Sequence, residues 1–180
     1  MVCSISWGVL NISTVAVDKA PRWTAEDRSL LVGGVAMPES LREGLVLHWE
    51  RVTPYVKTYV PDAPEDAECH VAFVGDEAAG ELRCARHWNG YLCVHDLVVG
   101  AAFRRQGVGA ALVQHAKKRA RELHLAGVTL ETQNTNWPAC QLYERCGFEL
   151  GGFDRFVYKA LDEGSSEIAL FWYGVERDSD

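Results

Sequence analysis

The sequence of 180 residues lacks an apolar run long enough to cross a membrane, and it lacks a basic leader. A membrane-spanning helix needs about 20 consecutive apolar residues. The first 17 residues are fairly apolar, but three serines and Asn11 interrupt them. Signal peptides begin with a basic segment, and none precedes this stretch. We therefore expect a soluble, cytoplasmic protein without a membrane partner.

Positive charge is also scarce, because the net charge is −7 and the sequence pI is about 5.4. Nucleic-acid-binding domains usually present a basic face, so we expect no nucleic-acid partner. An acidic surface attracts amines, which is compatible with a cationic substrate. The alternative is that the negative charge serves only solubility.

The cysteines form no Cys-x-x-Cys pair and no spacing typical of a metal site. We expect buried free thiols in a reducing compartment and no bound metal. A catalytic cysteine is an alternative without a recognisable partner pattern. The six cysteines are Cys3, Cys69, Cys84, Cys93, Cys140 and Cys146.

Residues 1–68 show weak periodicity and are punctuated by proline and glycine. Residues 40–49 and 52–60 could each form a strand or a short helix. The acidic stretch 62–68 predicts a solvated loop. At this length we expect a single domain over residues 1–180.

From Cys69 onward the patterns are sharper and predict a core over residues 69–175. Apolar spacing indicates strands and one amphipathic helix, while Pro138 and Gly147 mark the start and end of a second helix. The order predicts a mixed sheet with helices packed on it. The expected strands are 69–74, 80–85, 91–99, 128–132, 153–161 and 167–175, with a helix at 107–123.

Glycines and arginines lie where the predicted strand 91–99 gives way to the helix. The first N–H groups of a helix lack intrahelical partners and attract anions, and small residues allow close approach. Arg104 and Arg105 add donors suited to phosphate oxygens. Neither a Gly-Lys-Ser/Thr P-loop nor a Rossmann fingerprint is present. The alternative is a glycine-rich turn with two solvated arginines.

Two motifs resemble those of the GNAT superfamily of N-acetyltransferases. Arg104-x-x-Gly107-x-Gly109 is similar to its acyl-CoA pyrophosphate loop, and Asn136-x-x-Ala139-x-x-x-Tyr143-x-x-x-Gly147-Phe148 is similar to its second signature. The resemblance implies an α/β (mixed α+β) fold, in which a central, mostly antiparallel mixed sheet with a V-shaped splay is flanked by helices. It also implies acetyl-CoA as co-substrate and no metal.

Further segments resemble the streptothricin acetyltransferases within this superfamily. The similarity covers about residues 45–175 and leaves residues 1–45 poorly matched. Where those enzymes tend to carry two adjacent acids in the central strand, this chain has His95-Asp96. The matching segments are residues 54–59, Trp88-Asn89, 129–133 and 167–173.

The resemblance assigns the acetyl-CoA contacts to three places. The main chain of Leu97, Val98 and Val99 would pair with the pantetheine arm, and Asn136 would also contact it. The pyrophosphate would lie against the loop residues Arg104, Arg105, Gln106, Gly107, Val108, Gly109 and Ala110.

Tyr143 is the expected general acid, because a phenol is protonated at neutral pH and can donate to the departing thiolate. It could instead be a core tyrosine. The base is open between Asp96, which the resemblance favours, and His95, whose side-chain type titrates near neutral pH. As strand neighbours they should point to opposite faces. Glu131 is a third acid that could act through water.

Acidic and aromatic side chains suit a cationic acceptor, through carboxylate and cation–π contacts. Each could also be an ordinary surface or sheet residue. Trp172 and Tyr173 are expected in the core or in a homodimer interface, so a homodimer stays open. The candidate acceptor-binding residues are Trp88, Asn89, Glu131, Asp154 and Glu167.

The expected function is therefore acetyl transfer from acetyl-CoA to the amino group of a cationic small molecule, foremost a streptothricin-class antibiotic. We expect direct attack in a ternary complex, because no cysteine has a recognisable base partner. The alternatives are an N-acetyltransferase of protein N-termini or polyamines, and an acyl-CoA-binding sensor without turnover.

Overall fold

The computed structural model describes residues 3–7, 10–18, 21–41, 44–61, 63–161 and 165–175. The chain forms two compact units whose residues alternate along the sequence. The first unit contains Met1–Ser29, Thr58–Val128 and Val175–Asp180. The second unit contains Leu30–Lys57 and Thr129–Gly174.

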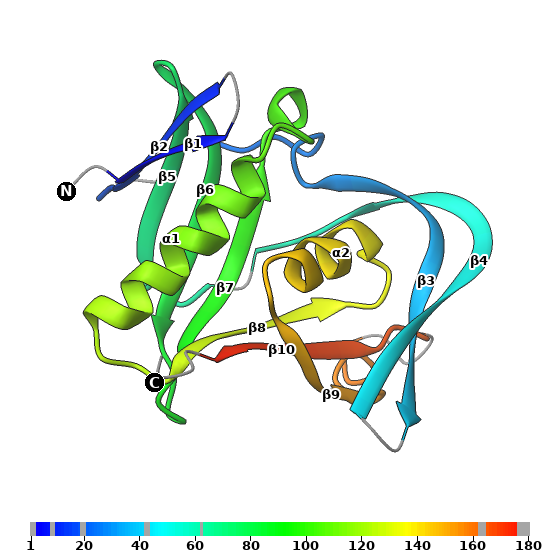
Figure 1. Cartoon of the computed structure of the whole chain (residues 1–180). Helices are drawn as coiled ribbons and strands as arrows, with labels where there is room; N and C mark the ends of the chain where they lie inside the picture. Colours follow the sequence, from blue (N-terminus) through cyan, green and yellow to red (C-terminus); the bar gives the residue numbers. More distant parts are fainter. Residues whose placement is uncertain are drawn as a thin grey trace. The chain divides into compact units, whose positions relative to one another are not determined.

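Five antiparallel strands form the sheet of the first unit, in the order β1-β2-β5-β6-β7 (Figure 1). The hairpin predicted after Cys69 is confirmed, with its turn at Gly75 and Asp76. Residues 3–7 and 10–16, which the sequence left without assignment, add the two outer strands. The bounds are β1 (Cys3–Trp7), β2 (Leu10–Ala16), β5 (Glu68–Val74), β6 (Glu77–Arg86) and β7 (Leu92–Val99).

The predicted amphipathic helix is α1 (Val108–Glu122), which lies along one face of this sheet (Figure 1). Gly80 of β6 permits the close approach, because a Cβ there would lie 2.9 Å from Cγ1 of Val108. Burying such apolar faces stabilises the unit by about 25 cal/mol for each Å² removed from water. The buried residues of α1 are Val108, Ala111, Leu112, Val113, Ala116 and Ala120.

The two polar members of the predicted stripe also face the sheet, where they meet β5. Nε2 of His115 lies 3.0 Å from Nδ1 of His70, and Arg119 donates to both oxygens of Glu68 at 2.7 and 2.8 Å. Burial lowers the pKa of His70, and burial together with the neighbouring His70 lowers that of His115 to about 4. Both imidazoles are therefore neutral at pH 7. Glu68 thus lies in an ion pair, where a solvated loop was expected.

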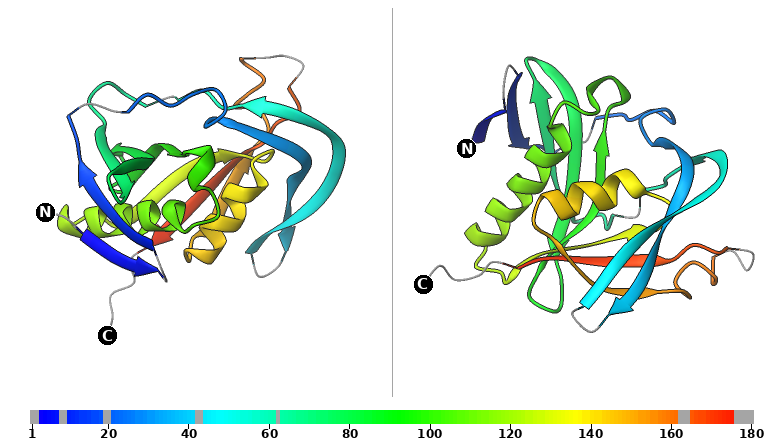
Figure 2. Two further views of the ribbon diagram at one scale, coloured as in Figure 1. Left: turned by 90° about the horizontal axis from the view of Figure 1, so that it is seen from above. Right: turned by 45° about the vertical axis from the view of Figure 1, so that its right-hand side comes forward.

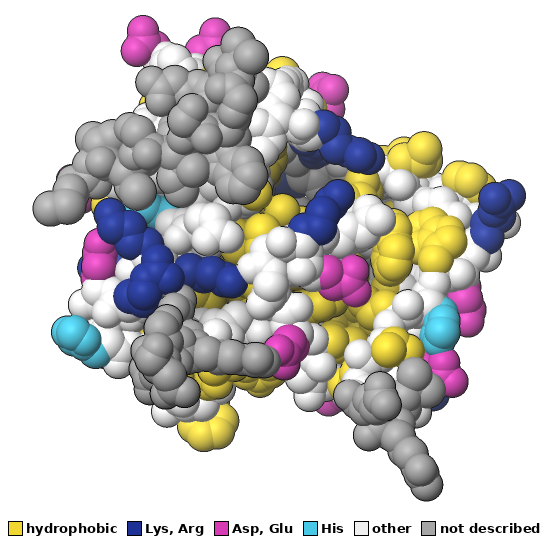
Figure 3. All heavy atoms as spheres, in the orientation of Figure 1, with side chains coloured by type: hydrophobic (Ala, Val, Ile, Leu, Met, Phe, Trp, Pro, Cys, Tyr) yellow, Lys and Arg dark blue, Asp and Glu magenta, His cyan; other side chains and the backbone are white. Residues whose placement is uncertain are grey.

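Lysine and arginine side chains gather over the C-terminal half of α1 (Figure 3). The C-terminal end of a helix carries partial negative charge, so cations there are favourable by about 0.3–1 kcal/mol each. Lys118 also pairs with Glu122 at 3.6 Å. Among the described residues, no helix is long and apolar enough to cross a membrane.

The second unit combines the strand order β8-β10-β9 with the helix α2. Its core contains Leu130, Leu170 and Trp172, each at most 2 % exposed. Trp172 is therefore a core residue, which is one of the two alternatives expected for it. The bounds are β8 (Gly127–Gln133), α2 (Trp137–Arg145), β9 (Glu149–Asp154) and β10 (Ala169–Val175).

The predicted strand at 153–161 is wrong, because β9 ends at Asp154. Oδ1 of Asp154 accepts a hydrogen bond from the N–H of Phe156 at 2.7 Å, which turns the chain out of the strand. Turns follow up to Leu161. The strand predicted at 167–175 begins only at Ala169. Most of the turn expected between the two strands, residues 162–164, lies outside the described residues.

Most of both segments that could have been strands or short helices, 40–49 and 52–60, lies in the second strand of a curved two-stranded ribbon (Figure 2). Its strands are β3 (Ser29–Leu41) and β4 (Gly44–Thr58), and β3 and β4 contain Pro38 and Pro54. Proline is tolerated here because both strands of a two-stranded sheet are edge strands. Trp49 packs so closely over Gly34 that a Cβ at Gly34 would lie 2.1 Å from its ring.

Candidate active site

The loop after β7 leads into α1 through two residues with left-handed backbone. Arg105 has a φ of 63° and Gly107, the N-cap residue, a φ of 90°. No side chain caps this helix end, and the first intrahelical bond runs from Ala111 N to Gly107 O at 3.0 Å. The N–H groups before Ala111 therefore form the anion-attracting end of the helix, as the sequence predicted.

Arg104 in this structure binds main-chain carbonyl groups. Its guanidinium donates to the carbonyl oxygens of Val99 (3.3 Å), Ser29 (3.1 Å) and Glu26 (3.2 Å), and also to that of Asp27. The resemblance implied that the Arg104 side chain binds the pyrophosphate. The exposed Arg105 is the neighbouring cation that these carbonyl contacts leave for a phosphate.

Asp27 strengthens the same connection from the other side. Its Oδ1 accepts a hydrogen bond from the N–H of Ala101 at 2.9 Å. Burial raises the pKa of this carboxyl, but the hydrogen bonds from Ala101 and Thr24 and the charge of Arg104 outweigh burial, so the pKa is lowered. Arg104 and Asp27 therefore connect residues 24–29 to residues 100–107, the candidate anion-binding loop between β7 and α1.

His95 and Asp96 lie at a β-bulge in the middle of β7. Arg83 of β6 pairs with Asp96 and the next residue, Cys84, pairs with Val94, so His95 is the extra residue. The simple alternation expected for strand neighbours does not apply at a bulge. Bulges are over-represented beside active sites, because they redirect side chains.

Asp96 is held in a two-point ion pair that the sequence did not predict. Arg28 donates from its two terminal nitrogens to the two carboxylate oxygens of Asp96 at 3.1 and 2.9 Å. Both side chains are mostly buried, at 16 % and 12 % exposed. This pair holds the Asp96 carboxylate in a fixed orientation beside the bulge.

Glu81 of β6 is a second acid that sequence reasoning missed. It is 2 % exposed, and it accepts a hydrogen bond from Nε1 of Trp23 at 2.8 Å. In a strand that alternates between small and charged residues, a glutamate is typical of the solvent face. The alternation of Glu81 and Leu82 indicates a strand, but it does not indicate that Glu81 is buried. Its hydrogen-bond partner lies 58 residues away in the sequence, so no local signal could reveal it.

In the second unit, the residues of the second signature have local structural roles. Asn136 is the N-cap of α2, and its Oδ1 accepts from the N–H of Ala139 at 3.3 Å. Gly147 follows the helix with a φ of 77°, as predicted. Tyr143 is 6 % exposed, and its ring centroid lies 6.0 Å from those of Phe148 and Trp172. Packing therefore fixes the ring of the expected acid.

The five candidate acceptor-binding residues are divided between the two units. Trp88 and Asn89 lie in the turn before β7, and Trp88 is 90 % exposed. The anion-binding loop follows the other end of this strand, and eight residues span about 26 Å. This distance removes Trp88 and Asn89 from the surroundings of the loop.

The other three are acids of the second unit, and each already has a partner. Glu131 accepts from the hydroxyl of Tyr158, and Asp154 accepts from the N–H of Phe156. Glu167 forms an ion pair with Lys57 and accepts from the hydroxyl of Thr135 at 3.4 Å. Burial, followed by the charge of Glu167, raises the pKa of the nearby Tyr55.

Five cysteines are free thiols, as predicted: Cys69, Cys84, Cys93, Cys140 and Cys146. Burial raises the pKa of Cys69 to about 11 and those of Cys84 and Cys140 to about 12. The thiolate is the nucleophilic form of cysteine. These three are therefore protonated at neutral pH and do not act as nucleophiles.

This mixed α/β fold, with a helix that starts uncapped after a bulged strand, offers free N–H groups to a phosphate. The sequence matches the Acetyltransferase (GNAT) family over residues 36–148. The chain belongs to this family and is an N-acetyltransferase, which confirms the predicted fold class and activity.

Individual relatives are also similar over most of the chain. Streptothricin acetyltransferase of Escherichia coli is 41 % identical over 133 residues, which cover 73 % of this chain and 76 % of that protein. Streptothricin acetyltransferase A of Bacillus subtilis (strain 168) is 34 % identical, over 67 % of this chain and 73 % of that protein.

One solved structure matches almost the whole fold. It is a proposed streptothricin acetyltransferase from Bacillus anthracis str. Ames, in complex with acetyl coenzyme A, with a TM-score of 0.83 and 30 % identity. The match covers 92 % of this chain and 99 % of that chain.

Gly107 offers a test of the anion site with a matched pair of substitutions. Asn and Asp both tolerate left-handed backbone, so Gly107→Asn and Gly107→Asp differ mainly in charge. We expect the Asp variant to bind CoA more weakly than the Asn variant by about 2 kcal/mol, near thirtyfold, because of repulsion between its carboxylate and the diphosphate. Calorimetric titration measures the difference. Equal affinities for the two variants would rule out a diphosphate beside Gly107.

Proposed function

We propose that this N-acetyltransferase transfers the acetyl group of acetyl-CoA to an amino group of streptothricin or a closely similar cationic small molecule. Capping the amine would give resistance to the antibiotic. The observation that carries the proposal is the similarity to streptothricin acetyltransferases over about three quarters of the chain. The net charge of −7 favours a cationic acceptor. Five free cysteines fit a reducing, cytoplasmic location.

The pyrophosphate of acetyl-CoA is assigned to the N–H groups at the start of α1 and to Arg105. The pantetheine arm is assigned to the main chain of Leu97, Val98 and Val99 and to Asn136. An N–H group of this strand would stabilise the developing oxyanion, a contribution of about 3–4 kcal/mol in other acyl-transfer enzymes.

The amine attacks the thioester carbonyl carbon directly. A C–N bond forms, the C–S bond breaks, and CoA leaves as a thiolate that takes a proton from the hydroxyl of Tyr143. The protonated thiols of Cys69, Cys84 and Cys140 support this direct route over an acetyl-cysteine intermediate.

We assign removal of the amine proton to His95 and a positioning role to Asp96. Imidazole is the side chain suited to proton uptake near pH 7. The Arg28 guanidinium occupies both oxygens of Asp96, which favours its carboxylate as a fixed charge beside the bulge. This assignment reverses the order in which the sequence ranked the two residues.

A screen of acceptors tests the proposed substrate. Purified protein is mixed with acetyl-CoA and streptothricin, a polyamine or a peptide with a free N-terminus, and the released CoA thiol is measured. We expect kcat/KM for streptothricin within the range of about 10⁴–10⁸ M⁻¹s⁻¹ that enzymes show on their own substrates. Gly107→Asp, assayed at low acetyl-CoA concentration, serves as the control with reduced turnover. Turnover confined to peptides or polyamines, or CoA binding without turnover, would each refute the streptothricin proposal.

Tyr143→Phe tests the general acid. The ring packing against Phe148 and Trp172 is kept, so the fold and the affinity for acetyl-CoA should change little. We expect kcat to fall by about 10²–10⁴-fold, the usual contribution of a positioned acid. Tyr158→Phe removes a hydroxyl from the same unit and should leave kcat unchanged. A Tyr143→Phe enzyme with wild-type kcat would remove Tyr143 from the acid role.

The base is identified by a comparison of pH–rate profiles. We expect His95→Gln to lower kcat/KM by about 10²–10⁴-fold and to abolish the loss of activity at acidic pH. Asp96→Asn and Arg28→Gln break the same ion pair from opposite sides, so they should lower activity to a similar extent and keep that acidic limb. If Asp96→Asn abolishes activity while Arg28→Gln preserves it, Asp96 is the base and the assignment to His95 is wrong.

A further inference from the structure

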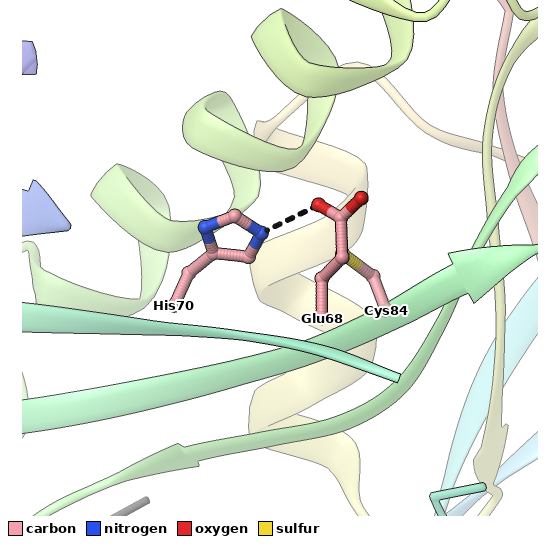
Figure 4. A group of neighbouring side chains, drawn as sticks. All are labelled: Glu68, His70 and Cys84. Atoms are coloured by element: carbon pink, nitrogen blue, oxygen red, sulfur yellow. Dashed lines mark hydrogen bonds and ion pairs between the residues drawn. The ribbon is translucent and has the colours of Figure 1, made fainter. Parts of the chain in front are cut away.

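A group of metal-ligating side chains lies in the first unit, on the face of the sheet that α1 covers. One ligand atom each from Glu68, His70 and Cys84 lies within 4.8 Å of the other two. Figure 4 shows the three side chains rising from the strands on the side of α1, with the His70 ring directed at the Glu68 carboxylate. This contact, from Nε2 of His70, measures 3.1 Å.

The backbone holds the three residues in a fixed arrangement. Glu68 and Cys84 are directly paired between β5 and β6, and His70 lies two residues further along β5 on the same face. Sites built on paired strands are more precise than sites built on loops. No metal was expected, because the cysteines have no spacing typical of a metal site. This set contains only one cysteine, and its members lie on two strands of a hairpin.

The set has the composition that Zn²⁺ prefers. Zinc binds thiolate sulfur at about 2.3 Å, imidazole nitrogen at about 2.0–2.1 Å and carboxylate oxygen at about 2.0–2.2 Å. Tetrahedral ligand atoms at these lengths lie about 3.5 Å apart. The observed limit of 4.8 Å therefore requires side-chain shifts of about 1 Å.

Side chains from α1 already occupy the positions of a second layer around such a site. Arg119 donates to both oxygens of Glu68, and each oxygen keeps a further lone pair for a metal. Nε2 of His115 lies 3.0 Å from Nδ1 of His70. Once Nε2 of His70 binds a metal, the Nδ1–H of His70 can donate a hydrogen bond to Nε2 of His115. Ligating histidines and carboxylates are usually held in this way by a second residue.

An open groove provides the path for the ion. Its volume is about 570 Å³, and Glu68, His70, His115 and Arg119 are among the residues that line it. A water molecule in this groove could complete a four-coordinate site with three protein ligands.

We propose that Glu68, His70 and Cys84 bind one Zn²⁺ ion between β5, β6 and α1, with water as the fourth ligand. The Cys84 thiol transfers its proton to the buffer when the sulfur binds the metal. His115 lies eight residues after Gly107, which places this part of α1 about 12 Å from the anion-binding loop. The ion would cross-link β5 and β6 on the side that α1 covers, and it takes no part in acetyl transfer.

Cobalt is the probe, because Co²⁺ bound to a thiolate gives a charge-transfer band in the near ultraviolet. Reduced, chelator-treated full-length protein without CoA is titrated with Co²⁺ and then with Zn²⁺. We expect one equivalent of Co²⁺, a charge-transfer band, and displacement of the cobalt by zinc. Folded wild-type protein that gives no such band would overturn the proposal, whatever the variants do.

The variants identify the ligands. Cys84→Ser should abolish the charge-transfer band. Cys93 is a half-buried thiol on the adjoining strand β7, and Cys93→Ser should keep the band. Glu68→Gln keeps the thiol, so the band should remain while the affinity falls by at least about tenfold. Circular dichroism checks that each variant is folded. A band lost in Cys93→Ser and kept in Cys84→Ser, or an unchanged affinity in Glu68→Gln, would show adventitious binding and refute the site.

Discussion

The start of α1 is the constraint on which the candidate active site depends. The helix begins at Gly107 in a left-handed conformation, and no side chain there caps the free N–H groups. A capping serine or aspartate in place of this glycine would stabilise the helix start by about a few tenths of a kcal/mol, and this chain forgoes that gain. An uncapped helix start of this kind attracts anions. The close packing of α1 on Gly80 keeps the axis of the helix, and hence the direction of these N–H groups, fixed against β6.

Arg104 extends this constraint to the segment before β3. Its guanidinium binds the carbonyl groups of Glu26, Asp27 and Ser29, and Arg28 between them holds Asp96 on the central strand. The anion-binding loop and the bulge of β7 are thereby connected through one short segment. A change at Arg104 should therefore affect both the phosphate end and the acidic residue beside the proposed base.

Local signals explain how much of the fold the sequence could predict. The elements between Glu68 and Gly147 were predicted within a few residues, because each has apolar periodicity together with a cap, a proline or a left-handed glycine. The strand expected at 153–161 failed because its apolar residues resemble a strand, whereas Asp154 starts a turn. The ribbon β3–β4 stayed ambiguous, since its prolines suggest a loop unless both strands are edges.

The candidate site was predictable only where its residues serve the local backbone. Gly107, Asn136 and Gly147 have a motif spacing and a helix end to explain them. Arg28 and Glu81 were missed because their partners lie 68 and 58 residues away, and a charged residue in an isolated segment is indistinguishable from a solvated one. Local patterns thus predicted the two helix ends and left the charges beside the bulge of β7 undetermined. Those charges arise from tertiary packing.

The buried acids and thiols of the first unit also limit how the enzyme can accelerate the reaction. Asp96 and Glu81 are engaged by Arg28 and Trp23, and burial keeps the thiols of Cys69 and Cys84 protonated. A strongly basic or nucleophilic group is not what these residues provide. Positioning an amine against a thioester can by itself supply about 7–11 kcal/mol, which exceeds the contribution of a single proton transfer. A rigid bulge beside a fixed anion site is the arrangement that such catalysis requires, because its gain depends on where the two reactants are held.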